Sequence, residues 1–164
     1  MTGTDGKKAT RLCPCGFLGH YSGKCHCTPD QVSRYRNRIS GPLLDRIDLH
    51  IEVPAVPEKD LGSRQSGESS TAIRARVTAA RSCQIARQGK PNAYLSVKEV
   101  GEHCIADADA DQLARKAISA LGLSARAYHR ILKVARTIAD LVGASGISTT
   151  HVAEAVQYRR YERI

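Results

Sequence analysis

One segment near the C-terminus of this 164-residue chain constrains the fold more than any other. Its apolar residues recur every three or four positions, which is the spacing of one face of an α-helix. Ser124 is a suitable N-cap before the run, and Gly143 is a suitable stop after it. The pattern predicts a long helix over 125–142. Its apolar stripe consists of Ile131, Leu132, Ala135, Ile138, Ala139 and Leu141.

The rest of the C-terminal half also reads as helical. Aromatic residues make up only 4% of the sequence, so any core rests on Leu, Ile, Val and Ala, which favours helices. Periodicity and capping residues predict further helices over 71–88, from Ser96 to Cys104, from Asp107 or Asp109 to about Leu121, and from Ser148 or Thr149 onward. Cys83 and Cys104 have no cysteine nearby in sequence, and we expect both to be small core residues.

Upstream of these helices, the stretch SGPLLDRIDLHIEV at 40–53 combines a Gly-Pro turn with alternating Leu49, Ile51 and Val53. This alternation predicts a strand. Arg46 lies where the strand begins, between Asp45 and Asp48. An arginine in this position either pairs with a neighbouring aspartate or offers its planar fork of donors to a phosphate or carboxylate of a partner.

Four cysteines form two C-x-C pairs that are separated by nine residues, several of them turn-forming. They are Cys13, Cys15, Cys25 and Cys27. Four thiolates on two tight turns can close a tetrahedral zinc site, with His20 or His26 as a substitute for one cysteine. Bound zinc would offset the low apolar content of this segment. The other interpretations are a reduced thiol cluster and disulfides that form only in air.

A short helix is expected directly after the cysteines. Thr28 can cap it, Pro29 suits its first position, and Gln31 completes a capping box. The helix should run to about Asn37. Its exposed arginines either contact nucleic acid or face solvent; they are Arg34, Arg36 and Arg38.

Composition shifts divide the chain. The segment 54–69 is rich in Pro, Gly and Ser, which is typical of a linker. The polar residues 1–12 are expected to lack fixed structure. The predicted parts are therefore 1–12, a cysteine-bearing part over 13–53, the linker 54–69 and a helical domain over 70–162.

The net charge of +9 and the pI of about 9.5 favour an anionic partner, with nucleic acid as the leading candidate. No apolar run has the length of a transmembrane helix, and the first ten residues are too polar for a signal peptide. We therefore expect a cytoplasmic protein without membrane attachment. In that reducing compartment, six cysteines favour metal or free thiols over disulfides.

Several stretches resemble the magnesium-chelatase-like family of AAA+ ATPases, more narrowly its YifB/ComM branch. The most specific is LSARAYHRILKVARTIADL at 123–141. The others are SGPLLDRIDLHIEVP from residue 40, CPCGFLGHYSGKCHCT at 13–28, ARQGKPNA at 86–93 and HVAEAVQYRR at 151–160. The resemblance covers about 13–162. It implies a mainly α chain: a four- to five-helix lid domain, preceded by a zinc-binding segment and a short remnant, helix plus strand, of the α/β ATPase core.

The resemblance also implies roles for two arginines. Arg46 matches the arginine finger that acts in trans on the γ-phosphate held by a neighbouring subunit. Arg126 matches the second sensor of the lid, and the first turn of a helix suits an anion. The alternative for Arg126 is an ordinary solvated arginine.

The polar side of the helix over 125–142 supplies further candidates. Arg130 and Lys133, together with Arg34 and Arg36, are the candidates for contacts with nucleic acid, and Arg136 would extend the basic surface. His129 has no catalytic partner that the sequence identifies.

The sequence lacks the phosphate-binding loop G-x-x-x-x-G-K-[ST] and an acidic magnesium ligand after a strand. This chain alone should not hydrolyse ATP, so ATP and magnesium are expected only in a complete ring. In the family such rings are hexamers that act on DNA as branch-migration helicases. Before Cys13 the sequence no longer resembles the family. We expect that the chain begins inside a longer gene or that an altered reading frame replaced the upstream part. The alternatives are a stand-alone zinc-containing helical module that binds nucleic acid or protein, and a non-functional gene remnant.

Overall fold

The computed structural model describes residues 12–38, 40, 46–51, 53, 56 and 67–159. The chain divides into two compact units. The first consists of Met1–Leu44, Glu52–Arg64 and Ile164, and the second of Asp45–Ile51 and Gln65–Arg163. The N-terminal tail predicted to lack structure lies almost wholly outside the described residues, as does most of the predicted linker.

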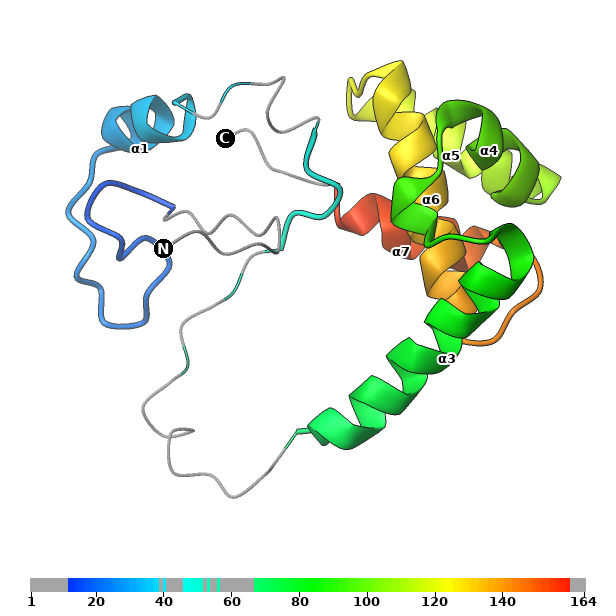
Figure 1. Ribbon diagram of the computed structural model, residues 1–164. Coiled ribbons are helices and arrows are strands. Elements are labelled where there is room, and N and C mark those ends of the chain that lie inside the picture. The colour runs from blue at the N-terminus through cyan, green and yellow to red at the C-terminus, as the bar shows by residue number, and fades with distance from the viewer. Residues whose placement is uncertain are drawn as a thin grey trace. The chain divides into compact units, whose positions relative to one another are not determined.

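The second unit is built from helices, as predicted (Figure 1). Helix α6 contacts all the other helices of this unit. Within the described part of the chain, no helix is both long and apolar enough to cross a membrane. The helices of the unit are α3 (Ser70–Gln88), the 3-10 helix η2 (Asn92–Tyr94), α4 (Val97–His103), α5 (Ala108–Ala120), α6 (Ala125–Leu141) and α7 (Thr149–Gln157).

Local capping chemistry sets where these helices begin. The Ser96 side chain accepts a hydrogen bond from the backbone N–H of Glu99, whose carboxylate bonds back to the Ser96 backbone. Asp107 and Ser124 cap α5 and α6 in the same manner, without the return bond. Gly89 ends α3 in the left-handed conformation, with φ of 74°. The predicted starts of α4, α5 and α6 are thereby confirmed.

The core of this unit lies around the apolar stripe of α6. Small side chains contribute much of it, so the helices can approach one another closely. Cys104 belongs to this core, as predicted, whereas the prediction for Cys83 is wrong because this thiol is exposed on α3. The fully buried residues include Val100, Ala110, Ala114, Ala127, Ile131, Ala135, Ala139, Val152 and Ala155.

A buried polar network ties α3 and η2 to α6. The guanidinium of Arg87 forms two hydrogen bonds, of 2.8 and 3.0 Å, with the carboxylate of Asp140. Arg136 donates to the same carboxylate at 3.0 Å, and the Asn92 side-chain amide donates to it at 2.9 Å. Arg136 is only 3% exposed. It is therefore part of the interior and does not extend a basic surface.

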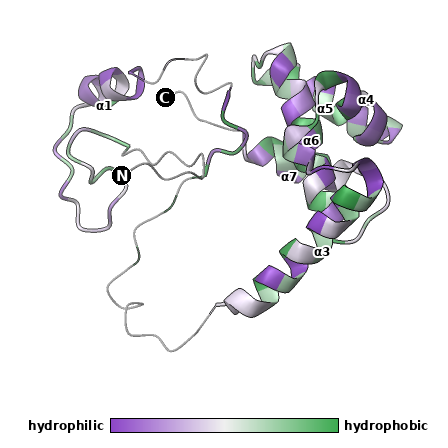
Figure 2. Ribbon diagram, in the orientation of Figure 1, coloured by the Kyte–Doolittle hydropathy of each residue, from purple (hydrophilic) through white to green (hydrophobic). Residues whose placement is uncertain are grey.

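The first unit contains α1 (Pro29–Arg36), which begins with the predicted capping box between Thr28 and Gln31. Figure 2 shows α1 as largely hydrophilic, and none of its residues is buried. Caps and polar contacts therefore hold this helix more than apolar packing does.

The predicted strand over Leu49, Ile51 and Val53 is wrong, because none of these residues lies in a strand and all three are exposed. A strand needs a neighbouring strand to pair its backbone groups. Here the backbone N–H of His50 instead donates to the carbonyl of Tyr158 at 2.7 Å.

Candidate functional site

The segment 46–51 docks on the helical unit. Asp48 forms an ion pair with Arg130 of α6. Arg159, just after α7, donates a hydrogen bond to the carbonyl of Ile47. With the backbone bond between His50 and Tyr158, the contacts reach both α6 and the end of α7. Arg46 and Arg126 therefore belong to one compact unit.

Arg46 is exposed and makes no hydrogen bond or ion pair with any residue that the structure describes. Its neighbour Asp48, the partner considered for a local pair, is engaged by Arg130 instead. The other neighbour, Asp45, lies outside the described residues. An exposed guanidinium without a carboxylate partner keeps all its donors available for an incoming anion.

Arg126 is also exposed, in the first turn of the 17-residue helix α6. This turn contains no acidic residue, so nothing there neutralises the positive potential of the helix N-terminus. The described residues offer Arg126 no hydrogen bond or ion pair. It is thus a second available guanidinium on the same unit.

The candidates for contacts with nucleic acid differ in whether their side chains already have a partner in the structure. Arg130 is held by Asp48, and Lys133 donates to the carbonyl of Ala93 at 3.4 Å. Arg36 donates through Nε to the carbonyl of Leu12 at 3.3 Å, whereas Arg34 is exposed. Of these four, Arg34 is the one without a partner among the described residues.

The four cysteines converge on one point. The Sγ atoms of Cys13 and Cys15 are 3.3 Å apart, and Sγ of Cys25 lies 3.8 and 3.6 Å from them. All four sulfurs, that of Cys27 included, lie within 4.8 Å of one another. Zinc–sulfur bonds of about 2.3 Å in a tetrahedron separate the sulfurs by about 3.8 Å. The donor set therefore fits a tetrahedral metal ion.

Two other interpretations of the cysteine cluster, disulfide bonds and a histidine in place of one cysteine, can be compared with the structure. The sulfur separations exceed the roughly 2.05 Å of a disulfide bond, and all four cysteines are free thiols. Neither histidine of this segment joins the convergent ligand atoms. Nδ1 of His20 contacts the Ser22 hydroxyl at 2.7 Å instead.

Hydrogen bonding distributes the protons unevenly among the thiols. Burial raises the pKa of Cys13, but hydrogen bonds from the Cys15 thiol and from the backbone at Leu18 and Gly16 outweigh it and lower the pKa to about 6. For Cys27, a backbone hydrogen bond from Cys15 lowers the pKa, yet the Cys15 thiol and burial raise it to about 12. Cys13 is therefore a ready thiolate near neutral pH, whereas Cys27 would release its proton when a metal binds.

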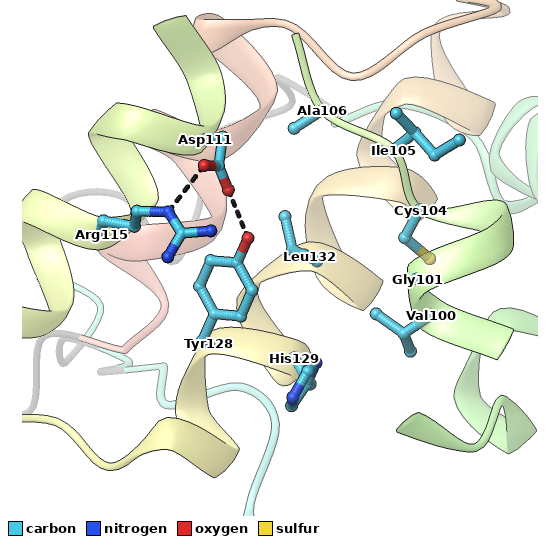
Figure 3. Close-up of a pocket in the computed structure, with 10 residues that line it drawn as sticks. All are labelled: Val100, Gly101, Cys104, Ile105, Ala106, Asp111, Arg115, Tyr128, His129 and Leu132. Carbon is cyan, nitrogen blue, oxygen red and sulfur yellow. Dashed lines mark hydrogen bonds and ion pairs between the residues drawn. The ribbon is translucent and has the colours of Figure 1, made fainter. Parts of the chain in front are cut away.

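A pocket of about 270 Å³ lies among α4, α5 and α6. Figure 3 shows the Tyr128 hydroxyl directed toward Asp111, to which it donates a hydrogen bond. Arg115 also bonds Asp111, at 2.7 Å, and this contact lowers the pKa of that carboxyl. Burial raises the pKa of the Cys104 thiol to about 11, so it is a poor nucleophile. The Asp111 carboxylate in this pocket is thus already engaged by Tyr128 and Arg115.

Sequence reasoning missed this pocket and the network around Asp140. Asp111 and Tyr128 lie on different helices, and Arg87 is 53 residues from Asp140. No local spacing signals such pairs. The first turn of α6 and the two cysteine pairs, in contrast, can be recognised in the sequence because their residues are close together along the chain.

Comparison with known proteins identifies the family. Residues 67–159 match the family model described as magnesium chelatase, subunit ChlI C-terminal, and residues 7–61 match the model for magnesium chelatase, subunit ChlI.

Three relatives extend over most of the chain. Competence protein ComM of Haemophilus influenzae is 51% identical over 149 residues, which cover 89% of this chain and 29% of ComM. The protein YifB of Escherichia coli is 45% identical over 148 residues, 89% of this chain and 29% of YifB. A protein of Mycobacterium tuberculosis is 31% identical over 157 residues, which cover 93% of this chain and 30% of that protein. The chain thus spans under a third of the length of these relatives. It belongs to the magnesium chelatase subunit ChlI family, within which it matches the C-terminal part of proteins of the ComM and YifB type.

Proposed function

We propose that this chain supplies the arginine side of an ATP site in a ring-forming AAA+ ATPase that remodels DNA by branch migration. Arg46 acts in trans as the arginine finger on nucleotide held by a neighbouring subunit, in a ring that is hexameric in the family. Arg126 acts as the second sensor. The observation that carries this proposal is the presence of two exposed arginines, free of carboxylates among the described residues, on one compact unit.

The chemistry of phosphoryl transfer explains why such arginines matter. Negative charge spreads over the equatorial oxygens of the transferred phosphoryl group, and a preorganised guanidinium stabilises that charge. The contacts of the segment 46–51 with α6 and Tyr158 fix the backbone that carries Arg46. A fixed backbone lets Arg46 act without first being ordered. Magnesium and the phosphate-binding loop would come from the remainder of such an ATPase, since this sequence lacks that loop.

The DNA part of the proposal rests on charge. The net charge of +9 favours a polyanion, and exposed arginines without partners lie on α1 and α3 of the described chain. They are Arg34, Arg74 and Arg81. Contacts with phosphates give binding that weakens steeply with salt and discriminates little between sequences. ATP and chromosomal DNA as ligands would place the protein in the cytoplasm.

The test of the ATPase role is a chimera. The upstream part of Haemophilus influenzae ComM is joined to residues 13–159 of this chain, in place of the matching segment of ComM. The chimera is expected to hydrolyse ATP, whereas the upstream part alone and this chain alone should not, because each holds one side of the site. Turnover is measured with a coupled assay, and assembly by light scattering. An assembled chimera that hydrolyses ATP no faster than the upstream part would contradict the proposal.

We further propose that the cysteine cluster holds a single structural zinc ion. The chain should retain zinc through dialysis, and the variant Cys13→Ser/Cys25→Ser should lose it, because two of four ligands are gone. Cys83→Ser, at the exposed thiol of α3, is the matched control and should keep full zinc. Metal content is measured by native mass spectrometry. Retention should weaken as the pH falls, since protons compete for the thiolates. Equal zinc content in both variants would refute the assignment.

A further inference from the structure

The loop between the two cysteine pairs displays aromatic side chains to solvent. Phe17 is 41% exposed and Tyr21 is 57% exposed. The His20 ring lies between them, edge-on to Phe17 with 5.7 Å between ring centroids and stacked on Tyr21 at 4.3 Å. The whole chain has one Phe and six Tyr, and this loop carries two of these seven residues. Such an exposed cluster points to a binding surface.

Hydrogen bonds preform this loop. The backbone N–H of Gly16 donates to the carbonyl of Cys13 at 3.1 Å, and that of His20 to the carbonyl of Phe17 at 3.0 Å. The N–H of Gly23 closes a further turn on His20 at 3.2 Å. Together with the convergent cysteines, these turns fix the positions from which the rings project. A preformed surface pays little ordering entropy when a ligand binds.

Acidic residues are absent from the sequence around the rings, and cationic residues are present. No Asp or Glu occurs over residues 12–29, and Lys24 in the loop is exposed. Helix α1 is anchored to the start of this segment through the bond from Arg36 to the Leu12 carbonyl. That helix carries the exposed Arg34 in its last turn. The loop therefore combines flat apolar faces with cationic groups in one unit.

We propose that the loop over 16–24 is a stacking platform for the unpaired bases of single-stranded nucleic acid. Phe17 and Tyr21 stack with bases, while Lys24 and Arg34 contact phosphates. Base–aromatic stacking tolerates any sequence, since every base has a π-face. Bases inside a duplex are already stacked, which restricts such contacts to single strands. The inference rests on the proposed action on DNA. It adds that the first unit binds single strands and not the duplex.

The experiment compares two labelled oligonucleotides of equal length, oligo-dT and its abasic counterpart, by fluorescence anisotropy with the 164-residue protein. Both should bind through their phosphates, and oligo-dT should bind more tightly. Tyr21→Ala and Phe17→Ala should each weaken binding of oligo-dT about tenfold and leave binding of the abasic strand unchanged. Tyr21→Phe, which keeps the ring, should bind like the parent.

Two controls separate stacking from loss of structure. Tyr94→Ala removes a still more exposed ring, 73% exposed, from the helical unit and should change nothing. Tyr21→Leu keeps an apolar side chain without a π-face and should behave like Tyr21→Ala at unchanged metal content. Equal binding of both oligonucleotides by all variants would overturn the stacking platform while the proposed action on DNA stands. A labelled duplex of the same length is measured alongside, and absence of binding to oligo-dT, to the abasic strand and to this duplex would overturn both.

Discussion

In the chimera with ComM, replacing Arg46 by alanine is expected to lower ATP turnover by about 10³-fold or more. The guanidinium would act on charge that develops only as the phosphoryl group leaves, so kcat should fall while the KM for ATP changes little. Arg46→Lys should recover only part of the loss, because an ammonium lacks the planar fork of donors. Steady-state kinetics over a range of ATP concentrations separate kcat from KM.

A mixing experiment tests whether Arg46 acts in trans. A chimera carrying Arg46→Ala is mixed with one whose upstream part lacks the phosphate-binding lysine. Each variant should be inactive alone. Mixed rings should regain activity, since some interfaces then combine an intact phosphate loop with an intact Arg46. Lys98→Ala, at a lysine of α4 whose side chain is 88% exposed, serves as the control and should leave turnover unchanged. Turnover that survives Arg46→Ala would show that Arg46 is only a solvated arginine.

The helices could be predicted from the sequence because their signals are local. A cap such as Ser124 acts on an N–H three residues away, and the apolar spacing of α6 can be recognised within a single segment. The same holds for the capping box of Thr28 and Gln31. The convergence of the cysteines follows from two C-x-C pairs on tight turns, again a pattern of short range.

The failures concern features that depend on distant residues. The alternation of Leu49, Ile51 and Val53 is typical of a strand, but the backbone there bonds with Tyr158, more than a hundred residues away in sequence. Arg136 was expected on the surface because an arginine seldom lies in the interior. Its pairing with Asp140, four residues on, is buried because Arg87 and Asn92 from distant segments bind the same carboxylate. That pairing alone does not predict burial, because exposed pairs at the same spacing are common.

Replacing Asp140 by asparagine is expected to lower the free energy of unfolding of the helical unit by about 3–5 kcal/mol. The Asp140 side chain is 2% exposed and pairs with both Arg87 and Arg136. Asparagine keeps the shape but removes the charge, which leaves two guanidinium groups, one of them fully buried, without their anion. Urea denaturation followed by circular dichroism measures the effect.

The control and the pH dependence make this prediction specific. Glu102→Gln removes the partner of Lys98 in a pair at 4.0 Å that solvent surrounds, and should leave stability unchanged within error.

Burial raises the pKa of Asp140, but the hydrogen bonds from Arg87 and Asn92 outweigh it, and the folded pKa is lowered. The carboxylate therefore contributes stability above its unfolded pKa of about 3.9, and this contribution is lost as the pH falls toward the folded value. The difference between parent and Asp140→Asn should accordingly shrink in acid. A difference that stays constant with pH would mean that asparagine disturbs packing and that the lost charge is not the cause.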